Sequence, residues 1–248
     1  MTREFNGTTD LIDVGSRPSL DDVGGSPGER SIAALVYPTD WGEASFGRVW
    51  DKAPAGGGWV FFVQNGDGAS TSPASFQLQL GGSTTGRACG ADNTLALNTW
   101  WFIAGSFTPS DGGPRLYVGS RTAAMAEVTY SVRAGDNRVE LVSYGSDAAQ
   151  TGYLGNRGAA DRTFQGRIGH LSIWDGRVSL AHFELIRQNP VSGWRFVTTG
   201  RARGVWNHLD VGVRSHRDES GFSNHGVPNS LQTLGSNVDM LPKSRMRL

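Results

Sequence analysis

The stretch WWFIAGSFTPSDGGPRLYVG, residues 100–119, decides the fold class. Two runs rich in aromatic and β-branched residues, 100–107 and 115–119, flank the turn sequence SDGG at residues 110–113. Runs of this composition are typical of strands, and Asp and Gly tolerate the backbone geometry of tight turns. The stretch therefore predicts an antiparallel hairpin.

The same pattern recurs along the chain. SFQLQL at residues 75–80 alternates three large apolar residues with two glutamines, which is the period of a strand with one buried face. Further strand-like runs lie at residues 31–38 and 59–64, and turn sequences lie at residues 65–68 and 135–137. Short strands joined by tight turns indicate antiparallel neighbours, so we expect an all-β, two-sheet antiparallel sandwich.

One segment reads as a helix, and the chain changes character after it. In SLAHFELIRQN, residues 179–189, Ser179 can cap the first turn and the Asn189–Pro190 pair ends the helix. Beyond it the strand rhythm weakens, which divides the chain into a sandwich over residues 1–187 and a C-terminal extension over residues 188–248. The extension holds enough large apolar residues that we expect part of it to dock on the sandwich or on a partner.

Composition and charge exclude several classes of protein. The 248 residues carry a net charge of zero and 35 glycines, as expected for a turn-rich globular chain. Cys89 is the only cysteine, so no disulfide can form within the chain. No apolar run reaches the length of a membrane helix, no targeting segment is visible, and the basic ending at residues 243–248 lacks interleaved aromatic residues. We expect neither a membrane nor a nucleic acid as a partner.

Two blocks of the sequence resemble a known family. Residues 98–101 and 116–118 match an Asn-Thr-Trp strand that is followed, after a Gly-rich turn, by a Leu-Tyr-Val strand. Residues 164–168 and 173–174 match a Phe-x-Gly-x-Ile strand that ends in an Ile-Trp pair before a short helix. Over about residues 5–187 the chain resembles the laminin-G-like and concanavalin-A-like jelly-roll domains. The resemblance implies a jelly-roll sandwich with one short helix.

A second resemblance concerns the end of the chain. Residues 184–196 and 217–226 resemble segments at the end of jelly-roll proteins that bacteriophages encode as virion structural proteins. This implies a capsid decoration, head-fibre or tail-associated protein that is made in the host cytoplasm and located in the virion. Its partners would be the major capsid protein or other virion proteins, and further copies of itself.

The sequence lacks the patterns that catalysis on this fold needs. A glucanase places two carboxylates on one strand face in a Glu-x-Asp-x-Glu type of spacing, and no such run is present. The Gly-x-Ser-x-Gly nucleophile pattern is also absent, and no histidine lies near Cys89 in the sequence. We therefore expect a protein that is not an enzyme.

Calcium is the one cofactor for which the sequence offers ligands. Asn65 with Asp67, and Asp92 with Asn93, place hard oxygen donors in turn segments, as calcium sites at the rim of related sandwiches do. The same residue types occur in turns for backbone geometry alone. Both readings stay open from the sequence, and no other cofactor is expected.

Eight tryptophans raise a different function, the binding of a carbohydrate. Strand alternation requires one of Trp100 and Trp101 to point into the core, whereas Trp41, Trp50 and Trp206 are expected in or near loops, where they could contact a glycan or a partner. The alternative to a virion component is thus a lectin-like module that recognises host-surface glycans.

Overall fold

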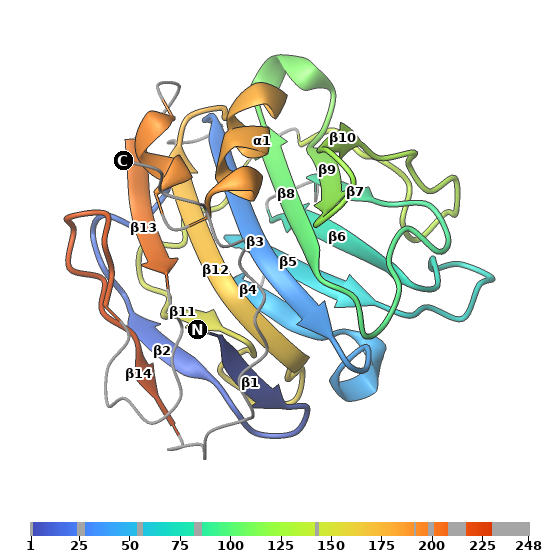
Figure 1. The fold of residues 1–248 in the computed structure, drawn as a ribbon, viewed down its shortest axis with the longest axis horizontal. Coiled ribbons are helices and arrows are strands. Elements are labelled where there is room, and N and C mark those ends of the chain that lie inside the picture. Colours follow the sequence, from blue (N-terminus) through green and yellow to red (C-terminus); the bar gives the residue numbers. More distant parts are fainter. Residues whose placement is uncertain are drawn as a thin grey trace, which may run out of the picture.

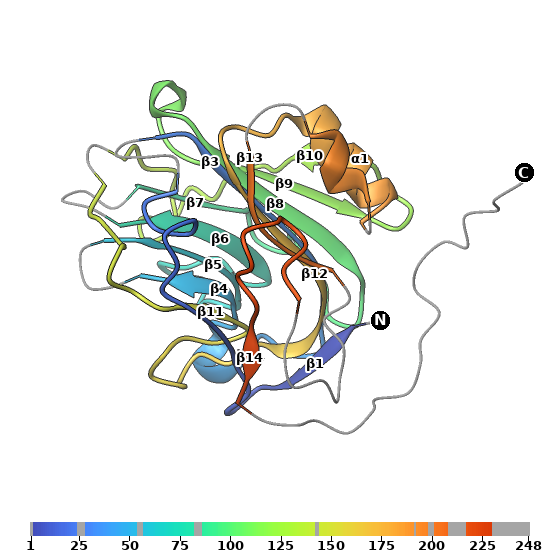
Figure 2. The same cartoon turned by 90° about the vertical axis from the view of Figure 1, so that its left-hand side faces the viewer.

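The computed structural model describes residues 2–23, 28–53, 57–81, 86–141, 144–190, 192–197, 201–207 and 217–229. Two antiparallel sheets lie face to face in it, as Figures 1 and 2 show. The predicted all-β, two-sheet antiparallel fold is confirmed. The basic ending at residues 243–248 lies outside the described residues.

The first sheet has β12 and β3 at its centre. Its strands follow the order β1-β12-β3-β8-β9-β10, and β13 also pairs with β12. Strand β1 pairs with residues 165–168 of β12 and β13 with residues 170–175, so these two strands share one side of β12. The bounds are β1 (Arg3–Asn6), β12 (Gln165–Asp175), β3 (Arg30–Pro38), β8 (Trp101–Phe107), β9 (Arg115–Ser120), β10 (Ala126–Glu127) and β13 (Arg201–Asn207).

The second sheet follows the order β14-β2-β11-β4-β5-β6-β7. Its bounds are β14 (Val227–Pro228), β2 (Ile12–Gly15), β11 (Gly152–Leu154), β4 (Arg48–Lys52), β5 (Trp59–Gln64), β6 (Ser75–Leu80) and β7 (Gly86–Cys89). Every pairing between these strands is antiparallel. The sheets are therefore built by hairpins and returns and not by βαβ units.

The hairpin predicted from residues 100–119 is present. Strand β8 pairs with β9 from Trp101 opposite Ser120 to Ser106 opposite Arg115. The connection contains the short 3-10 helix η2 (Pro109–Asp111), which ends at Gly112 with φ of 60°. Glycine adopts this left-handed conformation without a steric cost, which is why the turn carries it.

The main core fills the space between the two sheets. In β6 the side chains of Phe76, Leu78 and Leu80 are completely buried and belong to this core, as their alternation predicts. The rings of Trp50 and Trp206 stack there with centroids 6.0 Å apart. This stacking contact joins β4 of one sheet to β13 of the other.

A smaller apolar cluster covers part of the outer face of the first sheet. Helix α1 (Leu180–Gln188) lies outside this sheet, as Figure 2 shows, with Ser179 accepting a hydrogen bond from the backbone N–H of His182 at 3.3 Å. The predicted helix and its cap are thereby found. Phe183 and Ile186 of α1 are buried against outward-facing residues of the sheet, among them Phe102. The 3-10 helix η3 (Gly193–Phe196) follows α1, and η1 (Glu43–Ser45) precedes β4.

The segments after residue 187 supply strands to both sheets. Strand β13 pairs with β12 in the first sheet and β14 pairs with β2 in the second. Residues 218 and 219 contact the outer edge of β13, because the buried carboxylate of Asp218 accepts the backbone N–H of Val205 at 2.8 Å and the Glu219 N–H donates to the Val205 carbonyl at 2.8 Å. At Val205 the edge of β13 therefore has no unpaired backbone group to offer to another chain. Among the described residues, no helix is long and apolar enough to cross a membrane.

Candidate functional site

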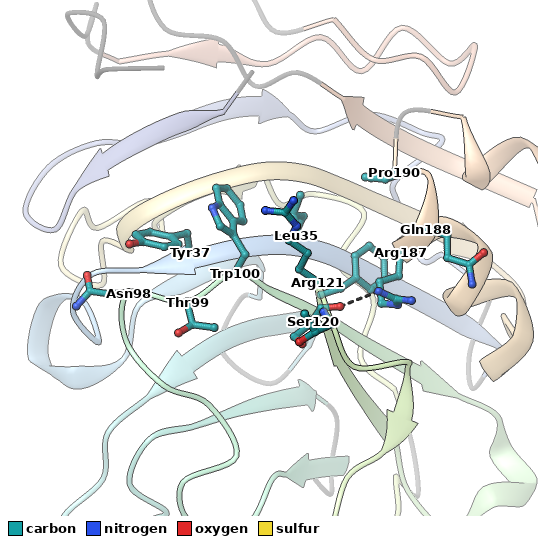
Figure 3. Close-up of a pocket in the computed structure, with 12 residues that line it drawn as sticks. Leu35, Tyr37, Asn98, Thr99, Trp100, Ser120, Arg121, Arg187, Gln188 and Pro190 are labelled. Carbon is teal, nitrogen blue, oxygen red and sulfur yellow. Dashed lines mark hydrogen bonds between the residues drawn. The ribbon is translucent and has the colours of Figure 1, made fainter. Parts of the chain in front are cut away.

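A groove of about 530 Å³ opens on the outer face of the first sheet, beside the end of α1 (Figure 3). Strand β3 and the start of β8 form its floor, the segment at residues 98–100 forms one end, and the turn after β9 and the end of α1 form the opposite wall. This volume lies within the range of small-molecule pockets in proteins.

Strand alternation decides which side chains reach the groove. On β3 the residues Ile32, Ala34 and Val36 face the main core, so Leu35 and Tyr37 face outward. Where β8 begins, Trp101 packs against the main core and Trp100 turns to the outer face. The floor is therefore apolar and aromatic.

Trp100 and Tyr37 form an aromatic pair at one end of the groove. Their ring centroids are 5.4 Å apart, and their planes are inclined by 43°. Trp100 is 7% exposed, whereas Tyr37 is half-buried. The indole Nε1 of Trp100 has no hydrogen-bond partner in the described part of the chain. Each of these side chains has only two χ angles to fix, so the pair gives the groove a rigid platform.

The opposite wall is held by one ion pair. Arg187 of α1 donates from Nε to Glu184 at 2.8 Å and from Nη2 to the same carboxylate at 2.6 Å. Its Nη1 donates to the carbonyl of Ser120 at 2.7 Å, and Glu184 also accepts the backbone N–H of Met125 at 2.8 Å. These contacts tie α1 to the turn between β9 and β10. The Arg187 guanidinium holds the pKa of Glu184 at about 2, below its usual value.

Other polar groups at the groove remain available. The hydroxyl of Tyr37, the side-chain amide of Asn98 and the guanidinium of Arg121 make no hydrogen bond or ion pair with any described residue. Figure 3 shows Asn98 at one end and Arg121 near the middle of the groove. An aromatic floor with a few convergent polar groups is the usual composition of a ligand site.

The groove offers little for acid-base catalysis. The described residues that line it include no carboxylate, histidine or cysteine. Its only hydroxyl groups belong to serine, threonine and tyrosine, and none of them has a base beside it in the lining. The arrangement can hold a ligand by packing and hydrogen bonding.

Two of the three tryptophans expected near loops lie elsewhere. Trp50 in β4 and Trp206 in β13 are completely buried in the main core, so the expectation that they contact a glycan or a partner is wrong. Their strands continue to these positions, and both indoles face inward, where Trp206 Nε1 donates to the carbonyl of Asn224 at 2.9 Å. Trp41 is half-buried against the same core and does not line the groove.

The first candidate calcium loop has the geometry of a turn. The Asp67 carboxylate accepts the backbone N–H groups of Ala69 at 2.9 Å and Ser70 at 3.1 Å, and these bonds lower the pKa of Asp67. Asn65 accepts the backbone N–H of Ala74 at 3.2 Å. Both side chains thus stabilise their own loop.

The second candidate loop is bound by an arginine. Arg133 donates from Nε to Asp92 at 2.9 Å and lowers the pKa of that carboxyl, and it also donates to the carbonyl of Gly68 in the first loop. Asn93 has φ of 60°, the turn conformation that asparagine tolerates. A guanidinium therefore lies between the two loops. Within the described ranges, no cluster of three or more His, Cys, Asp or Glu side chains could hold a metal ion.

Two buried polar clusters lie away from the groove. Lys52 Nζ contacts Asp21 at 2.8 Å and Asp147 at 3.0 Å, and the side chain of Lys52 is completely buried. In the second cluster, the Asp136 carboxylate accepts a hydrogen bond from the side-chain amide of Gln64 at 2.6 Å. Close to Gln64 lies Cys89, and burial raises the pKa of its thiol to about 12, so this cysteine is inert near neutral pH. Both clusters join loops to strands.

The groove itself was not predicted from the sequence. The adjacent tryptophans at positions 100 and 101 contained part of the signal, because alternation must send one of them to the outer face. No local pattern could connect Trp100 with the other groove residues Tyr37, Arg121 and Arg187, because they are too far apart in sequence. Only the pairing of β3, β8 and β9 brings them together.

The chain is similar to solved structures in its fold alone. No family model and no curated protein matches the chain. A candidate carbohydrate-binding protein of Bacteroides ovatus superposes with a TM-score of 0.55 at 16% identity, over 93% of this chain and 58% of that one. This chain therefore spans 58% of the length of that neighbour. Two antiparallel sheets with this superposition identify the fold as a jelly-roll sandwich of the concanavalin-A-like type.

Two further solved structures are similar at lower scores. The carbohydrate-binding module of family 40 from the Ruminococcus gnavus sialidase, bound to α2,3-sialyllactose, has a TM-score of 0.47 at 9% identity, over 75% of this chain and 98% of that one. A tailspike protein of an Escherichia coli O157:H7 bacteriophage has a TM-score of 0.49 at 13% identity, over 80% of this chain and 26% of that one.

Proposed function

We propose that this protein is a non-catalytic carbohydrate-binding module that holds its glycan in the groove beside α1. The observation that carries the proposal is the Trp100–Tyr37 pair, with ring centroids 5.4 Å apart at the floor of a groove of about 530 Å³. An aromatic ring packs against the apolar face of a pyranose, and the hydroxyl groups of the sugar need hydrogen-bond partners. Tyr37, Asn98 and Arg121 have such groups unoccupied at the groove.

The framework around the groove favours binding over chemistry. The floor is built on strands of a sheet, and the Glu184–Arg187 pair with Ser120 fixes the wall. A site held this rigidly loses little entropy when a ligand binds. The description of the Bacteroides ovatus neighbour as carbohydrate-binding agrees with the proposal, which itself rests on the groove.

The test is a glycan array followed by calorimetry on the glycans that bind. Tyr37→Ala removes a half-buried ring from the groove, and we expect it to weaken binding at least tenfold. Phe222→Ala is the matched control. Both rings are half-buried under an arginine, Arg167 at 5.7 Å from Tyr37 and Arg201 at 4.6 Å from Phe222, but Phe222 lies outside the groove. An array without a hit, or equal losses in both variants, contradicts the proposal.

A second candidate function is the virion structural role that the C-terminal resemblance implies. The observation in its favour is exposed apolar surface in the segment 184–196, where Leu185 is 44% and Phe196 is 62% exposed. Large exposed apolar side chains are typical of surfaces that contact other proteins. Under this proposal the protein is a capsid decoration, head-fibre or tail component that contacts a capsid protein or another virion protein.

Mass spectrometry of purified virions tests the second candidate, and absence of the protein from them would overturn it. Phe196→Ser should release the protein from particles. Truncation after Asn189 is not a suitable variant, because it removes β13 and with it Trp206 from the main core. As the matched control, Val227→Ser changes a 56% exposed residue outside the segment 184–196 and should stay bound.

A further inference from the structure

The groove contains one arginine that no acidic side chain in the described part of the chain neutralises. Arg121 follows β9, is exposed and lines the groove, and no described acidic side chain pairs with it. The other arginine of the lining, Arg187, and Arg167 outside the lining differ in this respect. Arg187 is paired with Glu184 at 2.6 Å, and Arg167, beside Tyr37, lies 3.7 Å from Glu4.

The turn that carries Arg121 is held in place. Ser120 Oγ accepts the backbone N–H of Ala123 at 3.0 Å, and the Ser120 N–H donates to the carbonyl of Ala123 at 3.0 Å. The Ser120 carbonyl accepts from Arg187 at 2.7 Å. The backbone next to Arg121 is therefore anchored to both its own turn and α1, which limits the positions that the guanidinium can reach. In the view of Figure 3 the Arg121 side chain lies between the Trp100 ring and Arg187.

We infer that the groove selects a glycan with a carboxylated sugar, whose carboxylate pairs with Arg121 while its ring packs on Trp100 and Tyr37; this inference rests on the proposed function. A guanidinium presents two parallel N–H groups that match the two oxygens of a carboxylate. A neutral sugar would also displace water from the Arg121 guanidinium, but it would accept only single hydrogen bonds from it. The difference in binding free energy therefore favours the carboxylated sugar over the neutral one.

The chemistry of the lining supports an anion over a cation. The described lining residues include two arginines and no carboxylate, so a bound anion meets no like charge in the groove itself. The aromatic pair alone would also accept a cationic ligand, because ring faces attract cations. Arg121 excludes that ligand by repulsion.

Two kinds of sugar supply this carboxylate, sialic acids and uronic acids, and the experiment separates them. Calorimetry on the full chain compares sialyllactose with lactose, and an oligogalacturonide with its methyl ester. The first pair differs by the sialic acid, and the second differs in the charge of the uronic acid. We expect wild-type protein to prefer the charged member of one pair by on the order of tenfold, and the pair identifies the source of the carboxylate.

Arg121→Gln should abolish this preference, so that both members of the pair bind with the same affinity. Arg195→Gln is the matched control, because Arg195 has a 63% exposed side chain and lies outside the groove. The preference should also fall as salt rises from 50 mM to 500 mM.

Two results overturn the inference and leave the proposed function standing. One is equal affinity of wild-type protein for both members of each pair, and the other is a preference for the charged member that survives Arg121→Gln. A glycan array without any hit overturns the proposed function itself, and the inference falls with it.

Discussion

Trp100 and Trp101 are neighbours in sequence but lie on opposite faces of the first sheet. Trp101 packs against the main core and donates from Nε1 to the carbonyl of Ala96 at 2.9 Å, whereas Trp100 lies on the outer face and lines the groove with Tyr37. The two indoles have the same local sequence context and different surroundings. They are therefore a natural pair for separating a loss of binding from a loss of stability.

Trp100→Phe should weaken glycan binding by about tenfold, because the smaller ring supports the half-buried Tyr37 ring less firmly at the floor of the groove. Trp101→Phe should leave the affinity within about twofold, since Trp101 does not line the groove. Both variants shorten an aromatic side chain at the same end of β8, so their unfolding midpoints in urea report the common structural cost. Calorimetry with the same glycan gives the comparison, and equal affinity losses would contradict the placement of the site.

Lys52→Met should destabilise the protein by about 3–5 kcal/mol, because it leaves the buried carboxylate of Asp147 without its cation. Lys52 Nζ contacts Asp147, whose side chain is completely buried, at 3.0 Å, and Asp21 at 2.8 Å. Urea unfolding at pH 7 measures the loss. Adding Asp147→Asn to Lys52→Met should recover part of the stability, and a double variant with the summed losses of both single changes would argue against a coupled pair.

Asp51→Asn should stabilise the protein at pH 8. Burial raises the pKa of Asp51 to about 6 from its usual value of 3.8, despite Arg48 at 3.4 Å. A raised carboxyl pKa means that the folded state binds this proton more tightly than the unfolded state does. The stability from this group is complete below about pH 4 and is lost as the pH rises through 6.

The asparagine removes this penalty, so the gain should be about 1–3 kcal/mol at pH 8 and should vanish near pH 4. Urea titrations of both proteins across this range provide the measurement. A gain that does not change with pH would show that the effect has another origin.

Glu184→Gln should destabilise the wall of the groove at neutral pH by about 1 kcal/mol. The folded-state pKa of Glu184 is lowered to about 2 from 4.5, chiefly by the hydrogen bond from Arg187. A lowered carboxyl pKa contributes stability that is present above about pH 4.5 and is lost as the pH falls through 2. The difference between wild type and variant should therefore disappear near pH 2. Glu29→Gln, outside the groove, serves as the control in the same series.

Chelation of calcium should leave the unfolding temperature unchanged. The candidate residues Asp67 and Asp92 are engaged by backbone N–H groups and by Arg133, which also bonds to the carbonyl of Gly68. A guanidinium in this position competes with a divalent ion for the same oxygens. Differential scanning calorimetry with EDTA and with 5 mM calcium tests the prediction. A rise of several degrees in calcium alone would restore these loops as a metal site.

Much of the fold was predictable because its strongest signals are local. The alternation in residues 75–80 and the turn chemistry between β8 and β9 need only neighbouring residues to act, and both are found as expected. The helix beginning after Ser179 was predictable for the same reason. Strand β13 was not, because RARGVWN lacks a regular apolar period and becomes a strand by pairing with β12.

The candidate site was less predictable than the fold. Trp50 and Trp206 were expected near loops, yet their stacked contact lies in the core, because both of their strands continue through these positions. A tryptophan in a short polar run looks the same in sequence whether its strand ends before it or after it.

The sequence by itself determined the class of the fold and the absence of a paired-carboxylate motif, since apolar alternation, turn residues and motif spacing are properties of neighbouring positions. The tertiary structure decided where a ligand can bind. Tyr37, Trp100, Arg121 and Arg187 come from four separate parts of the chain, and only the order in which β3, β8 and β9 pair, with α1 packed beside them, places their side chains around one groove. Such long-range pairing depends on the burial of whole sheet faces, which no short stretch of sequence contains.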